Sequence, residues 1–305
     1  MEKKFMSALI CAFSRAYHSK ENEVKIFDDT IAELLLSKDE YNEIVENMSN
    51  GIKFFNPNFV GNKDEALRWI VDNQLAPSPL GRAAYAEKML KNAVCSSKVK
   101  QYLIFAAGYD SFAYRQPEWS KELEIFEIDH PVTASDKMER LKRAQIEIPC
   151  NLNYVAADFT QEKWIESLTK NERFDSTKIS FCSLLGLSYY LSKADFENMI
   201  KIIGEIIPKG SPLVFEYPDD ETYAKKAAER TKKQVILANG AKEKMLAGYS
   251  YDEMEKLLCR CGFSIYEHLT PDQITKQYFE EYNKANPDHY MSAFDNVNYC
   301  LAVRE

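Results

Sequence analysis

From residue 99 onward, short apolar runs alternate with longer stretches in which apolar residues recur at helical spacing. The runs are rich in aromatic and β-branched residues and end near glycine or an acidic residue, which is typical of buried strands. They are Val99–Ala107, Leu123–Asp129, Leu152–Ala157, Lys178–Leu187 and Pro212–Tyr217. The helical stretches between them are Pro131–Arg143, Thr160–Thr169 and Ala194–Ile207. This alternation predicts an α/β protein whose parallel sheet carries helices on both faces.

The C-terminal part of the chain predicts two further strands that pair in antiparallel fashion at the edge of the sheet. A charged helical stretch, Glu221–Lys244, precedes a helix at Tyr251–Cys261 that ends at Gly262. Phe263–Leu269 and Val297–Val303 then have strand character, and the segment between them, Pro271–Asn283, is helical. The complete sheet is therefore predicted to have seven strands, mostly parallel.

The N-terminal residues predict helices and no strand. Met6, Ile10, Phe13 and Tyr17 recur at helical spacing, as do the apolar residues of later segments. These segments are Thr30–Ser37, Lys63–Leu75 and, after a break at Pro77-Ser78-Pro79, about Leu80–Val94. We expect residues 1–95 to form a helical cap or lid on a core of residues 96–305, with a helical insertion near 219–250.

Composition excludes several classes of protein. The 305 residues carry 39 basic and 47 acidic side chains, a net charge of −8, whereas broad nucleic-acid binding needs a basic surface. No apolar run approaches the roughly 18 residues of a membrane span. Seven scattered cysteines without paired spacing favour reduced thiols in a cytoplasmic protein, and neither they nor the four histidines predict a metal site. The oligomeric state is not indicated.

Three successive predicted strands end in residues that suit an adenosine. Gly108 follows the first strand, Asp129 ends the second, and Asp158-Phe159 follows the third. A glycine admits a close ligand, a carboxylate can accept hydrogen bonds from both ribose hydroxyls, and an acid with an aromatic ring suits adenine. The GxGxxG loop that binds a pyrophosphate is absent, which disfavours a nicotinamide oxidoreductase. A nucleoside cofactor without phosphates is S-adenosylmethionine.

The same residues resemble the leucine carboxyl methyltransferase family, particularly its bacterial branch. Ala106–Arg115 (AAGYDSFAYR) is similar to that family's GAGLDTRAYR motif, and Phe126–Pro131, with Lys137 later, to its ElDxP…K segment. Further matches are the motifs at Ser14–Ser19 and Ile26–Asp29, the Gly81-Arg82 helix, Ala157–Phe159 with Trp164, and Gly186–Leu191 (GLSYYL), which resembles EGvlmYL. The resemblance implies a Rossmann-like class I methyltransferase fold that uses S-adenosylmethionine.

By the same resemblance, Arg82 would pair with the methionine carboxylate, Gly108 would admit the methionine moiety, Asp129 would hold the ribose, and Asp158 with Phe159 the adenine. The full set of expected cofactor-binding residues is Arg82, Ala106, Gly108, Asp110, Asp129, His130, Asp158, Phe159, Ser183 and Leu185. We expect Lys137 to be exposed to solvent and leave it outside this set.

The expected reaction is O-methylation of a carboxylate or hydroxyl on a small molecule or a peptide terminus. A carboxylate needs no general base, whereas a hydroxyl does, and the candidates are Tyr189, Tyr190 and Glu216. Three family positions differ here: Ala106 replaces the first motif glycine, Leu185 the glutamate before the EG glycine, and Phe112 an arginine. An alternative is therefore a catalytically weak or inactive protein that binds S-adenosylmethionine in a regulatory role.

Overall fold

The computed structural model describes residues 6–161, 163–224, 226–240 and 243–305. Its seven strands are β1 (Gln101–Phe105), β2 (Glu124–Asp129), β3 (Leu152–Ala156), β4 (Ser180–Leu184), β5 (Pro212–Pro218), β6 (Phe263–Leu269) and β7 (Val297–Arg304). They form one sheet in the order β3-β2-β1-β4-β5-β7-β6. Strands β1 to β5 are parallel, and β7 runs antiparallel to both β5 and β6. The predicted sheet and its antiparallel pair are confirmed.

The sheet separates two hydrophobic cores because side chains alternate between its faces along each strand. In β1, Tyr102 and Ile104 belong to the core beneath the N-terminal helices, whereas Leu103 and Phe105 belong to the core on the opposite face. All five residues of β1 are buried. A strand that is covered on both faces has a continuous run of apolar residues. For this reason the run at Val99–Ala107 predicts the strand β1.

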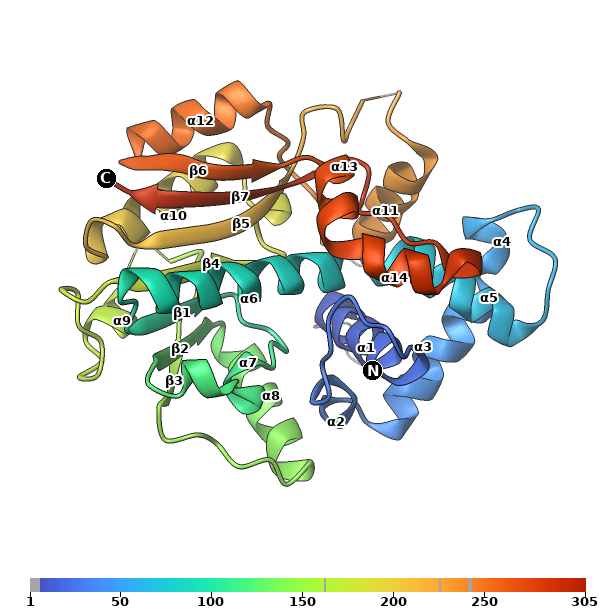
Figure 1. The fold of residues 1–305 in the computed structure, drawn as a ribbon, viewed down its shortest axis with the longest axis horizontal. Helices are drawn as coiled ribbons and strands as arrows, with labels where there is room; N and C mark the ends of the chain where they lie inside the picture. The colour runs from blue at the N-terminus through green and yellow to red at the C-terminus, as the bar shows by residue number, and fades with distance from the viewer. Residues whose placement is uncertain (1–5, 162, 225, 241–242) are drawn as a thin grey trace.

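Among the described residues from 6 onward, six helices precede the sheet: α1 (Met6–Glu21), α2 (Ala32–Leu35), α3 (Lys38–Asn50), α4 (Ile52–Phe55), α5 (Lys63–Ile70) and α6 (Pro77–Ser97). A π-helical segment, Val71–Leu75, continues α5. The helix α6 begins at Pro77 rather than after Pro79, because proline is tolerated in the first turn, where the backbone N–H groups have no helical partner. Figure 1 shows α1 to α5 gathered beyond the end of the sheet towards which β5 points.

The remaining helices are α7 (Phe112–Arg115), α8 (Pro131–Arg143), α9 (Glu166–Thr169), α10 (Lys193–Ile206), α11 (Glu229–Gly240), α12 (Tyr251–Arg260), α13 (Pro271–Ile274) and α14 (Glu280–Ala285), with short 3-10 turns at Glu118–Ser120, Ser188–Tyr190 and Pro287–His289. A π-helical turn at Thr275–Phe279 joins α13 to α14, so that the predicted helical segment there is confirmed. No helix among the described residues is both long enough and apolar enough to cross a membrane.

Two predicted helices are shorter than expected. In the stretch Thr160–Thr169, α9 covers only Glu166–Thr169, and residue 162 lies outside the described residues. The Asp158 carboxylate accepts hydrogen bonds from the backbone N–H and hydroxyl of Thr160 and so favours a turn there. In the stretch Glu221–Lys244, α11 covers only Glu229–Gly240, and residues 225, 241 and 242 lie outside the described residues. Asp219 binds the backbone N–H of Glu221 and holds the beginning of this stretch in a turn.

Candidate active site

A cavity of about 500 Å³ lies at the carboxyl ends of the strands. It is lined by residues of α1, α6 and α11, of the loops after β1, β2 and β4, and by Glu243 and Met245. Eight of the residues expected from the sequence line it: Arg82, Ala106, Gly108, Asp110, Asp129, Leu185, Tyr189 and Tyr190. In a parallel sheet, ligands bind in the crevice outside the carboxyl ends of the strands, and the cavity occupies this position.

The loop after β1 turns sharply, and Asp129 holds it in place. Ala106 and Gly108 both have left-handed backbone conformations, with φ of +53° and +50°. The backbone N–H of Gly108 donates to Asp129 Oδ2 at 2.5 Å, and that of His130 donates to Oδ1 at 2.6 Å. Burial raises the pKa of Asp129, although both hydrogen bonds act to lower it. Asp110 Oδ1 accepts from the backbone N–H of Phe112 and so caps α7.

Arg82 reaches the cavity from α6 and is paired with a buried carboxylate. Its Nη1 donates to Glu216 Oε1 at 2.9 Å, and its Nη2 donates to the sulfur of Cys11 at 3.5 Å. Burial alone would lower the pKa of Arg82, but the Glu216 carboxylate raises it, so that the guanidinium stays charged. Glu216 Oε1 also accepts from the backbone N–H of Gly186 at 2.6 Å. A Cβ at Gly186 would lie 2.7 Å from Arg82 Nη1, which explains the glycine there.

Two buried polar atoms at this end of the cavity lack partners. Glu216 Oε2 and the Tyr189 hydroxyl are both inaccessible to solvent and have no hydrogen-bond partner among the described residues. Such groups are costly to bury unpaired, so a bound polar ligand would stabilise this end of the cavity. Burial raises the pKa of both Tyr189 and Tyr190 well above 10, and both hydroxyls therefore stay protonated near neutral pH.

Five of the expected residues do not line the cavity: His130, Asp158, Phe159, Ser183 and Glu216. Asp158 and Phe159 follow β3 at the neighbouring strand end, where Phe159 packs against Trp164 with ring centroids 5.1 Å apart. The exposed His130 accepts from the backbone N–H of Val132 and caps α8. Ser183 is fully buried, and its hydroxyl lies 3.0 Å from that of Tyr102.

The expectation that Lys137 is exposed to solvent is wrong. Lys137 is only 1% exposed, and its Nζ donates to Glu127 Oε2 at 2.7 Å, beneath the end of β2. Burial raises the pKa of Glu127 to about 7, although the Lys137 ammonium acts to lower it. Lys137 lies about two turns into a largely polar helix, and its spacing alone predicts exposure to solvent, because the buried acid that it contacts lies on another element.

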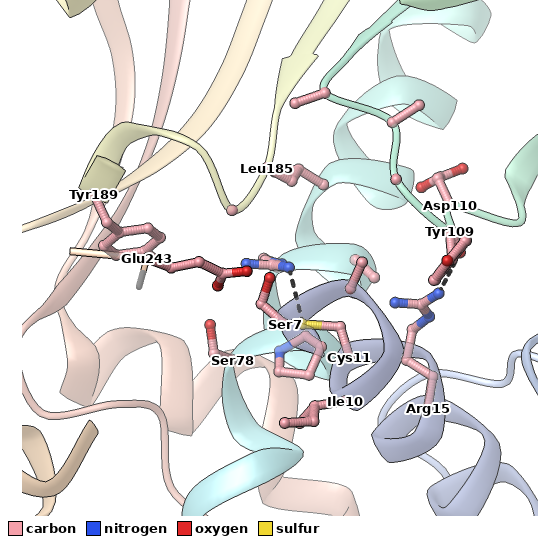
Figure 2. Close-up of a pocket in the computed structure, with 18 of the residues that line it drawn as sticks. Ser7, Ile10, Cys11, Arg15, Ser78, Tyr109, Asp110, Leu185, Tyr189 and Glu243 are labelled. Atoms are coloured by element: carbon pink, nitrogen blue, oxygen red, sulfur yellow. Dashed lines mark hydrogen bonds between the residues drawn. The ribbon is translucent and has the colours of Figure 1, made fainter. Parts of the chain in front are cut away.

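The sequence did not point to several other residues that line the cavity, among them Ser7, Cys11, Arg15 and Glu243. Arg15 of α1 donates to Asp29 at 2.7 Å and to the carbonyl oxygen of Tyr109 at 2.6 Å, and it therefore ties the first helix to the loop after β1. Figure 2 shows Glu243 and Tyr189 on one side of the cavity and Tyr109 and Asp110 on the other, with Ser7 and Cys11 between them.

The strand order and the cavity at the strand ends define the class I methyltransferase fold. Among solved structures, a DUF574-family protein from Streptomyces avermitilis has the same fold, with a TM-score of 0.61 at 11% identity over 96% of this chain and 97% of that one. A structure from Thermobifida fusca, described as a candidate methyltransferase, has a TM-score of 0.55 at 11% identity over 85% and 94%. These two likenesses concern the fold alone.

The sequence comparisons are more specific. The profile of the family described as leucine carboxyl methyltransferase matches residues 8–204, and the chain belongs to this family. It is 38% identical over 98% of both chains to YktD of Bacillus subtilis, which is named as a candidate S-adenosyl-L-methionine-dependent methyltransferase. Rv3399 of Mycobacterium tuberculosis, with a name of the same kind, is 24% identical over 80% of this chain and 68% of its own. The protein is thus an S-adenosylmethionine-dependent methyltransferase.

Proposed function

We propose that the protein transfers the methyl group of S-adenosylmethionine to an oxygen of its acceptor, a carboxylate or a hydroxyl on a small molecule or a peptide terminus. The cofactor part of this proposal rests on one observation: the backbone N–H of Gly108 donates a hydrogen bond to the Asp129 carboxylate, and both residues line the same cavity as Arg82. The family suggests an oxygen acceptor, because its name describes a carboxyl methyltransferase.

The residues present fit this cofactor. Asp129 would accept hydrogen bonds from the ribose, and Arg82 would donate from Nη2 to the carboxylate of the methionine part. The Tyr189 hydroxyl, which lacks a partner among the described residues, belongs to the same cavity lining as Arg82, and the charged groups of the methionine part would satisfy it. Asp158 and Phe159 would contact the adenine at the neighbouring strand end.

The bound cofactor supplies a methyl group that its sulfonium has already activated, so the protein mainly has to orient the acceptor and exclude water. Helix α1 closes the cavity through Ser7, Ile10 and Cys11, and Arg15 fixes this helix to the loop after β1. The protonated hydroxyl of Tyr190 can donate to the acceptor, whereas Glu216 acts on Arg82 and on the backbone of Gly186.

Calorimetry with S-adenosylmethionine and S-adenosylhomocysteine tests the cofactor part, and we expect heat of binding for both. A protein that binds neither compound, and whose melting temperature neither compound raises, would contradict the proposal. Methyl transfer from labelled cofactor into a fractionated cell extract then tests the reaction. Binding without transfer into any fraction would favour the binding protein that Leu185, at the position of the family's glutamate, suggests.

A further inference from the structure

The three cationic side chains that line the cavity are already paired with carboxylates. The pairs are Arg15 with Asp29 at 2.7 Å, Arg82 with Glu216 at 2.9 Å, and Arg115 with Glu87 at 2.7 Å. Of these, Arg82 keeps one donor that faces only a thiol, and this donor is the one that the proposed cofactor site uses. The described lining therefore contains no cation that is left over for an acceptor carboxylate.

The anionic side chains of the lining differ in this respect. Asp129 accepts from two backbone N–H groups and Asp110 from one, as described above. Glu243 also lines the cavity and is half-buried, but within the described part of the chain its carboxylate has neither an ion-pair partner nor a hydrogen-bond donor. Figure 2 shows it on the side of the cavity away from Asp110, beside Tyr189.

Part of the cavity lining is apolar. Apolar side chains of the lining come from α1, from the π-helical segment Val71–Leu75, from α6, from α11 and from the chain after it; they are Ile10, Leu75, Pro79, Leu237, Ala238 and Met245. On the same segment, Ile236 and Leu246 are 56% and 50% exposed. An acceptor with an apolar body would bury the apolar part of the cavity lining, whereas a highly charged acceptor would not.

We propose that Glu243 binds the acceptor, and that the acceptor is a neutral hydroxyl compound with an apolar body, not a carboxylate. This inference rests on the proposed function and narrows its two acceptor classes to one. A hydroxyl can donate a hydrogen bond to the Glu243 carboxylate, which lacks a partner within the described chain. A carboxylate in the same place would meet a like charge in a partly desolvated site, and the described lining offers it no compensating cation.

The same contact gives Glu243 a part in the reaction. When the hydroxyl oxygen attacks, a bond forms between that oxygen and the methyl carbon while the bond from carbon to sulfur breaks, and the electron pair stays on sulfur. The products are a methyl ether and neutral S-adenosylhomocysteine, and the hydroxyl proton passes to the Glu243 carboxylate. A carboxylate acceptor has no proton to give up and would leave Glu243 without a role.

Paired probes that differ only in the reacting group test the binding part. We would saturate the full-length protein with S-adenosylhomocysteine and titrate para-butylphenol and para-butylbenzoate at neutral pH. In the wild type, the phenol should bind at least about tenfold more tightly than the benzoate. Glu243→Gln should remove most of this preference, mainly by letting the benzoate bind. Glu229→Gln, which removes an exposed charge from the first turn of α11 outside the cavity lining, should leave the preference unchanged.

Each other outcome overturns this proposal about the acceptor. The proposed cofactor site is tested separately, because binding of S-adenosylhomocysteine is measured first. Equal or tighter binding of the benzoate, an unchanged preference in Glu243→Gln, or no binding of either probe would each do so. Failure to bind S-adenosylhomocysteine would instead contradict the proposed function itself. For the proton transfer, Glu243→Gln should lower kcat for the phenol at least about tenfold more than it raises KM, and an unchanged kcat would exclude this role.

Discussion

The cavity has two halves that are built in different ways, and we assign one to the cofactor and the other to the acceptor. The cofactor half consists of the ends of adjacent parallel strands, where the backbone itself places Gly108, Asp129 and Leu185 next to one another. The acceptor half is assembled from segments far apart in the chain, around Ile10, Ser78, Tyr190 and Glu243. In the first half the sheet determines which residues meet. In the second half, the packing of helices determines which residues meet. This packing cannot be predicted from a short stretch of sequence.

The halves also differ in how their charged groups are held. Behind the cofactor half lies the ion pair of Lys137 with Glu127, whose side chains are 1% and 2% exposed, and the Arg82–Glu216 pair sits at its edge. The acceptor half contains Glu243, for which the described residues supply no partner. Buried pairs of this kind fix positions, and breaking one is costly. We therefore expect substitutions in the cofactor half to affect stability and substitutions in the acceptor half to affect specificity.

The largest effect should follow from Lys137→Met. This change removes the partner of a fully buried carboxylate, and leaving a buried charge uncompensated typically costs about 3–5 kcal/mol. Urea denaturation followed by circular dichroism measures the free energy of unfolding. In the double variant Lys137→Met/Glu127→Leu, which replaces the pair by apolar side chains, most of the loss should be recovered. A single variant as stable as the wild type would show that the pair does not support β2.

The next effect concerns cofactor affinity. Asp129→Asn keeps the size of the side chain but replaces one oxygen by a donor, so it cannot accept from both Gly108 and the ribose. Loss of one such hydrogen bond to a charged group costs about 1.5–3 kcal/mol, or roughly ten- to a hundredfold in the dissociation constant of S-adenosylhomocysteine. Asp158→Asn, at the neighbouring strand end but outside the cavity lining, is the matched control. Calorimetry should show a smaller loss, and equal losses would contradict the central place given to Asp129.

The two halves were also unequally predictable from the sequence. All seven strands could be placed to within a few residues, because a strand buried on both faces needs a continuous apolar run. The residues that follow β1, β2 and β4 then line the cavity. Arg82 was predicted from the family resemblance alone, because the local sequence does not distinguish it from an arginine on an exposed helix face. Glu216 was expected as a candidate base near the acceptor, but a residue of strand β5 that faces Arg82 is buried with it.

The acceptor half could not be predicted, because its residues carry no local signature. Glu243 stands in a charged stretch whose composition indicates a solvated helix, and only the fold brings it next to Tyr190. Lys137 shows the same limit in the opposite direction, because its partner Glu127 lies on another element and packing alone reveals the pair. Turn chemistry accounts for the short helix α9, where the side chain of Asp158 competes with the helix for backbone donors.

A smaller effect on the free energy of unfolding should appear at acidic pH. It concerns the contact between α3 and α8. Glu40 of α3 forms two hydrogen bonds of 2.7 Å with Arg140 of α8. Burial alone would raise the pKa of Glu40, but the hydrogen bonds from Arg140 and Ser37 lower it from 4.5 to about 2. The folded protein thus holds fewer protons here than the unfolded chain, and the contribution is present above pH 4.5 and lost as the pH falls towards 2.

After allowance for solvent screening, this contribution amounts to about 1 kcal/mol. Unfolding midpoints in urea, measured between neutral pH and pH 3, should therefore fall less steeply for Glu40→Gln than for the wild type. The cofactor half supplies the comparison, because Asp129 has a raised pKa and contributes a change of the opposite sign. Parallel curves for the two proteins would show that the contact between Glu40 and Arg140 does not hold the cap in place.

The smallest expected effect tests whether the departure at Ala106 weakens the cofactor half. Ala106 has a φ of +53°, and this left-handed conformation destabilises a residue with a Cβ by about 1–2 kcal/mol. A glycine avoids this strain, but its greater flexibility in the unfolded chain lowers the free energy of unfolding by about 0.5–1 kcal/mol. Ala106→Gly should therefore stabilise the fold by about 0.5–1 kcal/mol. Lys98→Gly is the matched control, because Lys98 has a φ of +59° at the end of α6, away from the cavity, and should stabilise similarly. Only Ala106→Gly should also raise the affinity for S-adenosylhomocysteine, by a few-fold, since it removes a methyl group from the cavity wall. Equal affinities in the two variants would mean that Ala106 lowers the stability of the fold but does not weaken binding of the cofactor.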